Sequence, residues 1–190
     1  MGITDLPSFC VLPWIHLNLS PDGAASLCCH SPAAMNEGEH RLNAQTYTLR
    51  EIWESNALKD VRRRMAGGER IAQCGTCWHN ERFSGTSFRA ESNKRWLDGN
   101  PALRAAIESA ENWAAPGDPL YLDLRLGNLC NLKCTICKPL YSSQIERDPV
   151  HARWNTDAPH SRFPSRFAES EWWRAGALVD EIVDMSAPSS

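Results

Sequence analysis

The sequence lacks an excess of either charge and contains no long hydrophobic run. Its 20 basic and 23 acidic residues give a formal net charge of −3, whereas a nucleic-acid-binding domain is expected to be clearly basic. The three arginines at residues 62–64 are the main basic run, and we expect them on the solvated face of a helix. No stretch of about 18 apolar residues occurs, which is the length that a membrane-spanning helix needs. We therefore predict neither a nucleic-acid partner nor a membrane.

An export signal is also missing, because residues 1–10 have neither the basic start nor the apolar stretch of a signal peptide. Cysteine, in contrast, is abundant. The eight cysteines are Cys10, Cys28, Cys29, Cys74, Cys77, Cys130, Cys134 and Cys137. In a reducing compartment, clustered thiols more often bind metal than form disulfides. We expect a cytoplasmic protein whose cysteines bind metal.

The first cysteines flank a predicted β-hairpin. Leu17 and Leu19 alternate with polar residues as in a strand, and the Pro-Asp-Gly sequence at residues 21–23 is a strong turn signal. The return strand is predicted to end at Cys28 and Cys29. Because consecutive strand residues point to opposite faces, only one of these two thiols can readily face a given metal site.

Helices are predicted to fill most of residues 48–113. Thr48 and Glu51 form a capping box at the start of the first helix, and Asn56 is the expected cap of the second. Two more helices are expected over residues 87–97 and 101–113, with Ser87 and Asn100 as their respective caps. The helix-breaking residues that follow, 115–119, mark the predicted domain boundary.

Beyond this boundary, leucines alternate with other residues over positions 120–126, which predicts a strand. Three cysteines follow it at C-x3-C-x2-C spacing: Cys130, Cys134 and Cys137. Structural zinc takes four ligands and no cysteine follows Cys137, whereas three thiolates suit a cubane iron-sulfur cluster with one open iron. A zinc site completed by His151 or His160 and three unliganded thiols are the alternatives. A final helix is predicted near residues 170–185.

This C-x3-C-x2-C motif directly after a strand resembles the signature of radical S-adenosylmethionine enzymes. The resemblance implies a 4Fe-4S cluster on Cys130, Cys134 and Cys137, with S-adenosylmethionine on the fourth iron and Ile136 against its adenine. It further implies reductive cleavage of this cofactor to a 5′-deoxyadenosyl radical. An electron donor such as flavodoxin or ferredoxin is the expected partner.

The remaining constellation consists of Cys10, Cys28, Cys74 and Cys77. Four thiols of this kind can close around zinc or around a 4Fe-4S cluster, and their spacing does not separate these two outcomes. His30 and His79 are further potential zinc ligands, although polar surface roles are commoner for such residues.

The same cysteines, together with Phe9, the Pro-Asp-Gly turn and Ile52-Trp53, are similar to the twitch or SPASM module of radical S-adenosylmethionine proteins. The resemblance implies a second, auxiliary 4Fe-4S cluster on the four cysteines Cys10, Cys28, Cys74 and Cys77. It selects Cys28 rather than Cys29, since the hairpin ligand usually lies five residues after the turn glycine. It also implies that this module precedes the catalytic barrel here.

The predicted fold is therefore mixed. A small α+β twitch-like module occupies residues 1–114, and residues 120–190 form the first βα unit of an incomplete (β/α) barrel. Because a complete barrel takes about 250 residues, the chain is expected to be the N-terminal part of a longer enzyme. The single parallel strand of that unit is expected to lack a partner for either edge.

The predicted function is that of a radical S-adenosylmethionine enzyme, with catalysis expected of the full-length protein rather than of this chain alone. The family often modifies peptides, so a peptide is the expected substrate. The alternative is a non-catalytic zinc- or iron-sulfur-binding module for protein interaction or electron transfer.

Overall fold

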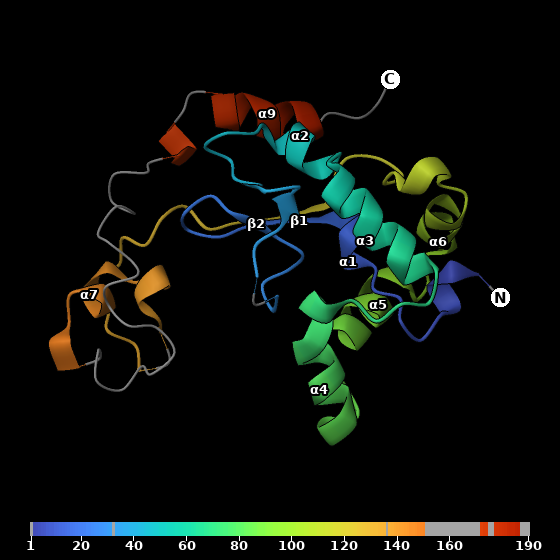
Figure 1. Ribbon diagram of the computed structural model, residues 1–190, viewed down its shortest axis with the longest axis horizontal. Helices are drawn as coiled ribbons and strands as arrows, with labels where there is room; N and C mark the ends of the chain where they lie inside the picture. The colour runs from blue at the N-terminus through green and yellow to red at the C-terminus, as the bar shows by residue number, and fades with distance from the viewer. Residues whose placement is uncertain (1, 32, 136, 151–171, 175–176, 187–190) are drawn as a thin grey trace.

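A three-stranded sheet lies at the centre of the computed structural model, which describes residues 2–31, 33–135, 137–150, 172–174 and 177–186. The strands are β1 (His16–Leu19), β2 (Ala25–Ser26) and β5 (Tyr121–Leu124), in the order β2-β1-β5 (Figure 1). β1 pairs antiparallel with β2 and parallel with β5. The described part of the chain is thus mixed α+β, as predicted; the barrel remains a prediction.

The predicted hairpin is confirmed, with two differences. A helical turn, α1 (Leu12–Ile15), precedes β1, and β2 ends at Ser26, so that Cys28 and Cys29 lie in a turn after the strand. The tight turn requires Gly23, whose φ of 78° lies in the left-handed region. The Oγ of Ser20 closes the turn by donating to the carbonyl of Ala24 (2.9 Å).

Most of the predicted helices are present. The capping box of Thr48 begins α2 (Leu49–Trp53), whereas α3 (Asn56–Ala66) is capped by Ser55 rather than by its first residue. Ser87 caps α5 (Phe88–Leu97), and Asn100 caps α6 (Pro101–Glu108). α6 is shorter than predicted because a separate 3-10 turn, η3 (Glu111–Trp113), follows with left-handed φ values at its last two residues.

Several elements were not predicted. The longest of them is α4 (Gly75–Ser84), and a small hairpin is formed by β3 (Asn36–Glu37) and β4 (His40–Arg41). The short elements are η1 (Ile3–Asp5), η2 (Ala72–Cys74), η4 (Pro139–Tyr141) and α7 (Ser143–Glu146), whereas η7 (Trp172–Arg174) is a 3-10 turn within the range of the predicted final helix. Among the described residues, no helix combines the length and apolar character needed to cross a bilayer.

The predicted strand at residues 120–126 is confirmed as β5, but it has a partner within the chain. His16 of β1 lies opposite Tyr121, and Leu19 lies opposite Leu124. The expectation that both strand edges lack partners was therefore wrong. A residue-level pattern cannot show a pairing between segments about 100 positions apart.

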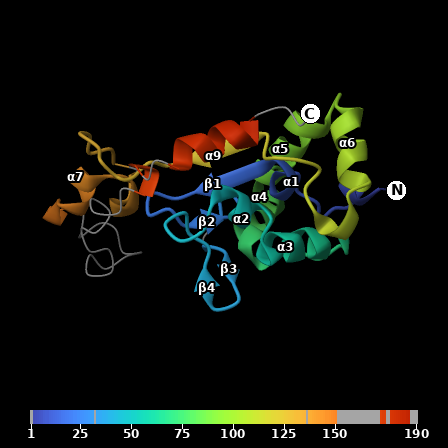
Figure 2. The same ribbon diagram turned by 90° about the horizontal axis from the view of Figure 1, so that it is seen from above.

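The core lies between the sheet and the helices. Its fully buried members include Phe9, Trp14, Ile15, Leu19, Ile52, Met65 and Ile71. The predicted C-terminal helix is α9 (Ala177–Ser186), whose Glu181 accepts a hydrogen bond from the backbone N–H of Leu49 at the start of α2 (2.6 Å). α9 thus lies over α2 and β1, whereas α7 lies at the end of the molecule opposite α6 (Figures 1 and 2).

Candidate metal centre

Four cysteines from three separate segments line one cavity. They are Cys10, Cys28, Cys74 and Cys77, and none of them is in a disulfide. The free volume of this cavity is about 10 Å³, so the surrounding side chains nearly fill it. We call it the thiol cavity. The structure thus brings together the four residues that the sequence indicated as one ligand set.

Cys10 is held by hydrogen bonds to the residues on either side of it. The carbonyl of Phe9 accepts from Arg89 Nη1 (2.5 Å) and from Asn93 Nδ2 (2.9 Å). Asn93 Oδ1 in turn accepts from the backbone N–H of Val11 (2.8 Å). Because both neighbours of Cys10 are fixed to α5, its thiol has a defined place at the cavity although no strand carries it.

Cys74 and Cys77 enter the cavity from the start of α4. Cys74 is the N-cap residue of that helix, and Cys77 lies in its first turn. The carbonyl of Ile71 accepts from the N–H of Cys74 (3.0 Å) and from Trp78 Nε1 (3.3 Å), which ties both ends of the motif to one buried residue. The C-x2-C spacing therefore places both thiols on one helical turn.

Burial keeps the thiols of Cys10, Cys28 and Cys74 protonated in the absence of metal. It raises the pKa of Cys28 to about 11 and that of Cys74 to about 12, and it raises the pKa of Cys10 well above its usual value. The nearby thiols contribute in the same direction, since several thiolates in one cavity repel one another. Metal binding at this cavity must therefore release protons, because thiolates are the metal ligands.

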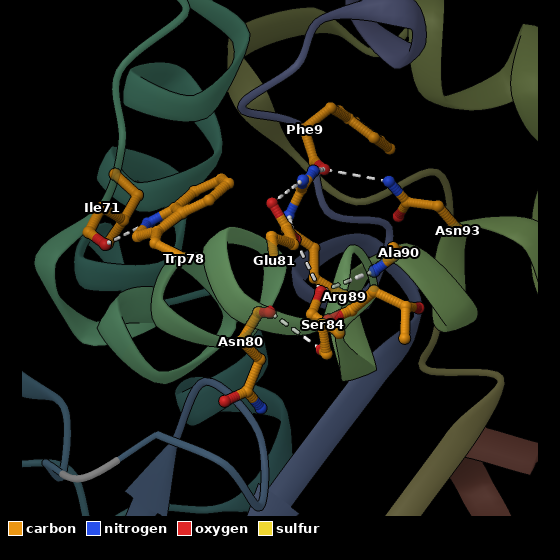
Figure 3. Close-up of polar contacts among 11 residues, drawn as sticks. Phe9, Ile71, Trp78, Asn80, Glu81, Ser84, Arg89, Ala90 and Asn93 are labelled. Atoms are coloured by element: carbon orange, nitrogen blue, oxygen red, sulfur yellow. Dashed lines mark hydrogen bonds and ion pairs between the residues drawn. The ribbon is translucent and has the colours of Figure 1, made fainter.

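A half-buried ion pair borders the thiol cavity. Arg89 lines it and pairs with Glu81 of α4, with Nη2 to Oε2 at 2.8 Å and Nε to Oε1 at 3.0 Å (Figure 3). Its guanidinium also lies over the ring of Trp78, 4.4 Å from the centroid. Ser87, which was expected to cap a helix, does so and also donates to Glu81 (2.6 Å). This network joins α4, α5 and the segment before Cys10.

Of the two histidines considered as ligands, one lies at the cavity. His30 lines it and stacks on Phe88, with ring centroids 4.6 Å apart. His79 lies instead against Phe83, which is 73% exposed. His30 and Phe88 therefore form an aromatic wall beside the four thiols.

Cys29 belongs to a different cavity. It lines a polar cavity of about 120 Å³ together with Asn18, Arg41 and Arg125, and it does not line the thiol cavity. Cys28 lines both. As expected, only one of these two neighbouring thiols lines the thiol cavity, although the two residues lie in a turn and not at the end of a strand.

The second set of cysteines lies on the segment after β5. Cys130 and Cys137 are half-buried and Cys134 is exposed, and the N–H of Cys137 donates to the carbonyl of Cys134 (3.0 Å). The N–H of Cys130 lies 3.3 Å from Ser143 Oγ, which docks this segment on α7. The predicted adenine contact, Ile136, lies outside the described residues.

His151 and His160, the alternative zinc ligands for this set, also lie outside the described residues. Within the described ranges, no three His, Cys, Asp or Glu side chains are grouped so as to hold a single metal ion. No histidine among the described residues therefore completes a zinc site with these three cysteines.

The donor set of the thiol cavity fits a 4Fe-4S cluster. In such a cluster each of four cysteine thiolates binds a different iron, so the sulfurs surround a volume and do not converge on one point. Four thiols lining one small, largely apolar cavity meet this requirement. On the second segment, three free thiols match the donor count of a cluster that leaves one iron open.

Comparison with known proteins concerns the part of the chain that contains the thiol cavity. Neither the curated proteins nor the solved structures that were searched contain a match to the chain. Residues 10–93, however, match the family model SPASM, described as an iron-sulfur cluster-binding domain. All four cysteines of the thiol cavity lie within the matched residues. The match supports iron-sulfur cluster binding by residues 10–93, and with it the predicted auxiliary SPASM module.

Proposed function

We propose that the chain is part of a radical S-adenosylmethionine protein with two 4Fe-4S clusters. Cys10, Cys28, Cys74 and Cys77 hold the auxiliary cluster in this proposal. The observation that carries the proposal is that these four cysteines line one cavity, although up to 67 positions separate them in the sequence. All four lie within the segment that matches an iron-sulfur domain. The second cluster is assigned to the three cysteines after β5, on their resemblance to the family motif.

The surroundings of the thiol cavity suit a group with negative charge. Four thiolates bring four negative charges into the cavity. Arg89 is the cation that lines the same cavity. Glu81 fixes the guanidinium in place, so the charge is held in position before any cluster binds. Phe88 and Leu12 give the same cavity an apolar lining. These residues bury the thiolates and offset part of their charge.

The second site is proposed to bind S-adenosylmethionine through Cys130, Cys134 and Cys137, with Ile136 against the adenine. When bound, the cluster and this cofactor supply one-electron chemistry that generates an organic radical. The chain holds the segment through Asn128, which is 3% exposed and whose Nδ2 donates to Glu146 of α7 (3.0 Å).

The same proposal names the partners. The substrate is a peptide, the electron donor is a small protein such as flavodoxin or ferredoxin, and the compartment is the cytoplasm. These statements follow from the family resemblance.

Iron content after anaerobic reconstitution tests the two cluster sites separately. We expect about eight irons per chain, since each cubane contains four. Cys28→Ala and Cys74→Ala should each reduce the count to about four, and so should Cys130→Ala, because each removes one ligand of one cluster. Absorbance near 400 nm and electron paramagnetic resonance identify the remaining cluster.

Cys29→Ala is the matched control, because it removes the thiol next to Cys28 that lines only the polar cavity. We expect its iron content to equal that of the unaltered chain. One tightly bound zinc without absorbance near 400 nm would contradict the auxiliary cluster and favour a zinc-stabilised module. Loss of iron in Cys29→Ala but not in Cys28→Ala would contradict the ligand assignment.

A further inference from the structure

An arginine expected in solvent is among the most deeply buried side chains. Arg62 of α3 is 1% exposed, so the expected solvated position was wrong for this arginine, whereas Arg63 is exposed and Arg64 is half-exposed. Its guanidinium donates to three backbone carbonyls, those of Pro13 (2.8 Å), Trp113 (3.3 Å) and Trp53 (3.4 Å). Burial lowers its pKa to about 10, so that it remains a cation at neutral pH. Among the described residues, no carboxylate forms an ion pair with it.

Arg62 lines a cavity of about 400 Å³ between α2, α3 and residues 114–118. This volume lies within the range of small-molecule sites in proteins, about 300–1,000 Å³. Lys59 lies one helical turn before Arg62 and lines the same cavity. Trp53 forms part of the wall, and its ring centroid is 4.8 Å from the guanidinium carbon of Arg62.

The other charged groups of this cavity are paired with one another. Arg50 forms ion pairs with Asp118 (3.0 Å) and with Glu54 (3.5 Å), at the edge of the cavity. Lys59 and Arg62 therefore remain as two cations without a carboxylate partner in the described part of the chain. A buried charge without an opposite charge is costly, and the carbonyl oxygens around Arg62 offset only part of that cost.

We propose that this cavity binds a small organic anion through its phosphate or carboxylate group. Lys59 supplies the mobile ammonium that contacts the anion, and Arg62 supplies fixed positive charge at the buried side of the cavity. The indole of Trp53 and the alanines at positions 114 and 115 offer an apolar wall for the rest of the molecule. The cavity shares no lining residue with the thiol cavity, so this proposal is independent of the iron-sulfur clusters.

Isothermal titration calorimetry of the full chain at low ionic strength tests the proposal. Inorganic phosphate, phenyl phosphate and benzoate are titrated separately, so that a phosphate ligand is distinguished from a carboxylate ligand. We expect saturable binding of at least one of them at one site per chain. Lys59→Ala should weaken that binding about tenfold or more, because a hydrogen bond to a charged group contributes about 1.5–3 kcal/mol.

Two variants provide the controls. Lys94→Ala removes the same charge from an exposed position on α5 and should change the affinity by no more than about twofold, since exposed charges are screened. Lys59→Arg keeps the cation and should retain binding. Alanine and arginine both favour helix, so these variants are expected to fold. Absence of saturable binding for all three anions would overturn the proposal, as would equal weakening by Lys59→Ala and Lys94→Ala.

Discussion

At the scale of single residues, the central strand contains a histidine whose ionisation opposes folding. His16 is 2% exposed and its ring stacks on Tyr121, with centroids 4.5 Å apart. Burial lowers its pKa to about 4, an effect that the nearby Asp123 only partly counteracts and that Arg125 reinforces. The folded state therefore contains a neutral imidazole where the unfolded chain binds a proton below pH 6.5.

This difference predicts a loss of stability in mild acid. Between pH 6.5 and pH 4 the unfolded state binds more protons than the folded state, so the free energy of unfolding falls as the pH is lowered through that range. The loss attributable to His16 is on the order of 3 kcal/mol. Urea unfolding of the iron-free chain at several pH values measures it.

The comparison with His16→Gln isolates the contribution of this residue, because glutamine does not titrate. Its unfolding free energy should depend less on pH over the same range, whatever its absolute stability. His40→Gln, at an exposed position of β4, is the matched control and should keep the pH dependence of the unaltered chain. Parallel pH profiles for the unaltered chain and His16→Gln would show that the burial of this imidazole has no such effect.

At the scale of helices and strands, local signals predicted what local chemistry determines. The capping box of Thr48 and the cap at Asn100 were recognisable because the side chain that starts each helix lies within three residues of the N–H that it accepts from. α4 was missed because Cys77 is its one buried residue, so no apolar stripe marks it. Its position after a C-x2-C motif was the available signal.

The start of α3 permits a direct test of cap assignment. Ser55 Oγ accepts from the N–H of Leu58 (3.3 Å), whereas Asn56 is already helical and uses its side chain to reach Glu37 (2.8 Å). Ser55→Ala should therefore lower the free energy of unfolding by about 1 kcal/mol. Asn56→Ala should lower it by about half of that or less, because its contact is exposed. Thermal or urea unfolding measures both, and a larger loss in Asn56→Ala would contradict the assignment.

At the scale of the whole molecule, the pairing of β1 with β5 joins regions that the sequence suggested were separate. β1 lies between β2 and β5, so it depends on β5 for one of its two edges. The burial of Arg62 is a similar case, since the carbonyls that receive it come from three separate segments. Neither feature has a local pattern, which is why the sequence predicted the elements and the cysteine set but not these contacts.

A shortened chain that ends at residue 118 should reveal this dependence. It retains every residue of the SPASM match but lacks β5 and α9. We expect a lower melting temperature and faster amide hydrogen exchange in β1, because one edge of that strand becomes exposed. Unchanged exchange in β1 would show that residues 1–118 fold without β5. A Leu122→Ala variant of the full chain, which retains the strand backbone, is the milder comparison.

The turn after β2 has a consequence that reaches beyond ligand choice. Cys28 borders both the thiol cavity and the polar cavity at the carboxyl ends of the parallel strands, and the next residue, Cys29, borders the second alone. Consecutive Cα atoms lie 3.8 Å apart across a trans peptide bond, so one amino-acid step connects the two compartments. A backbone shift at this step therefore changes the lining of both cavities together.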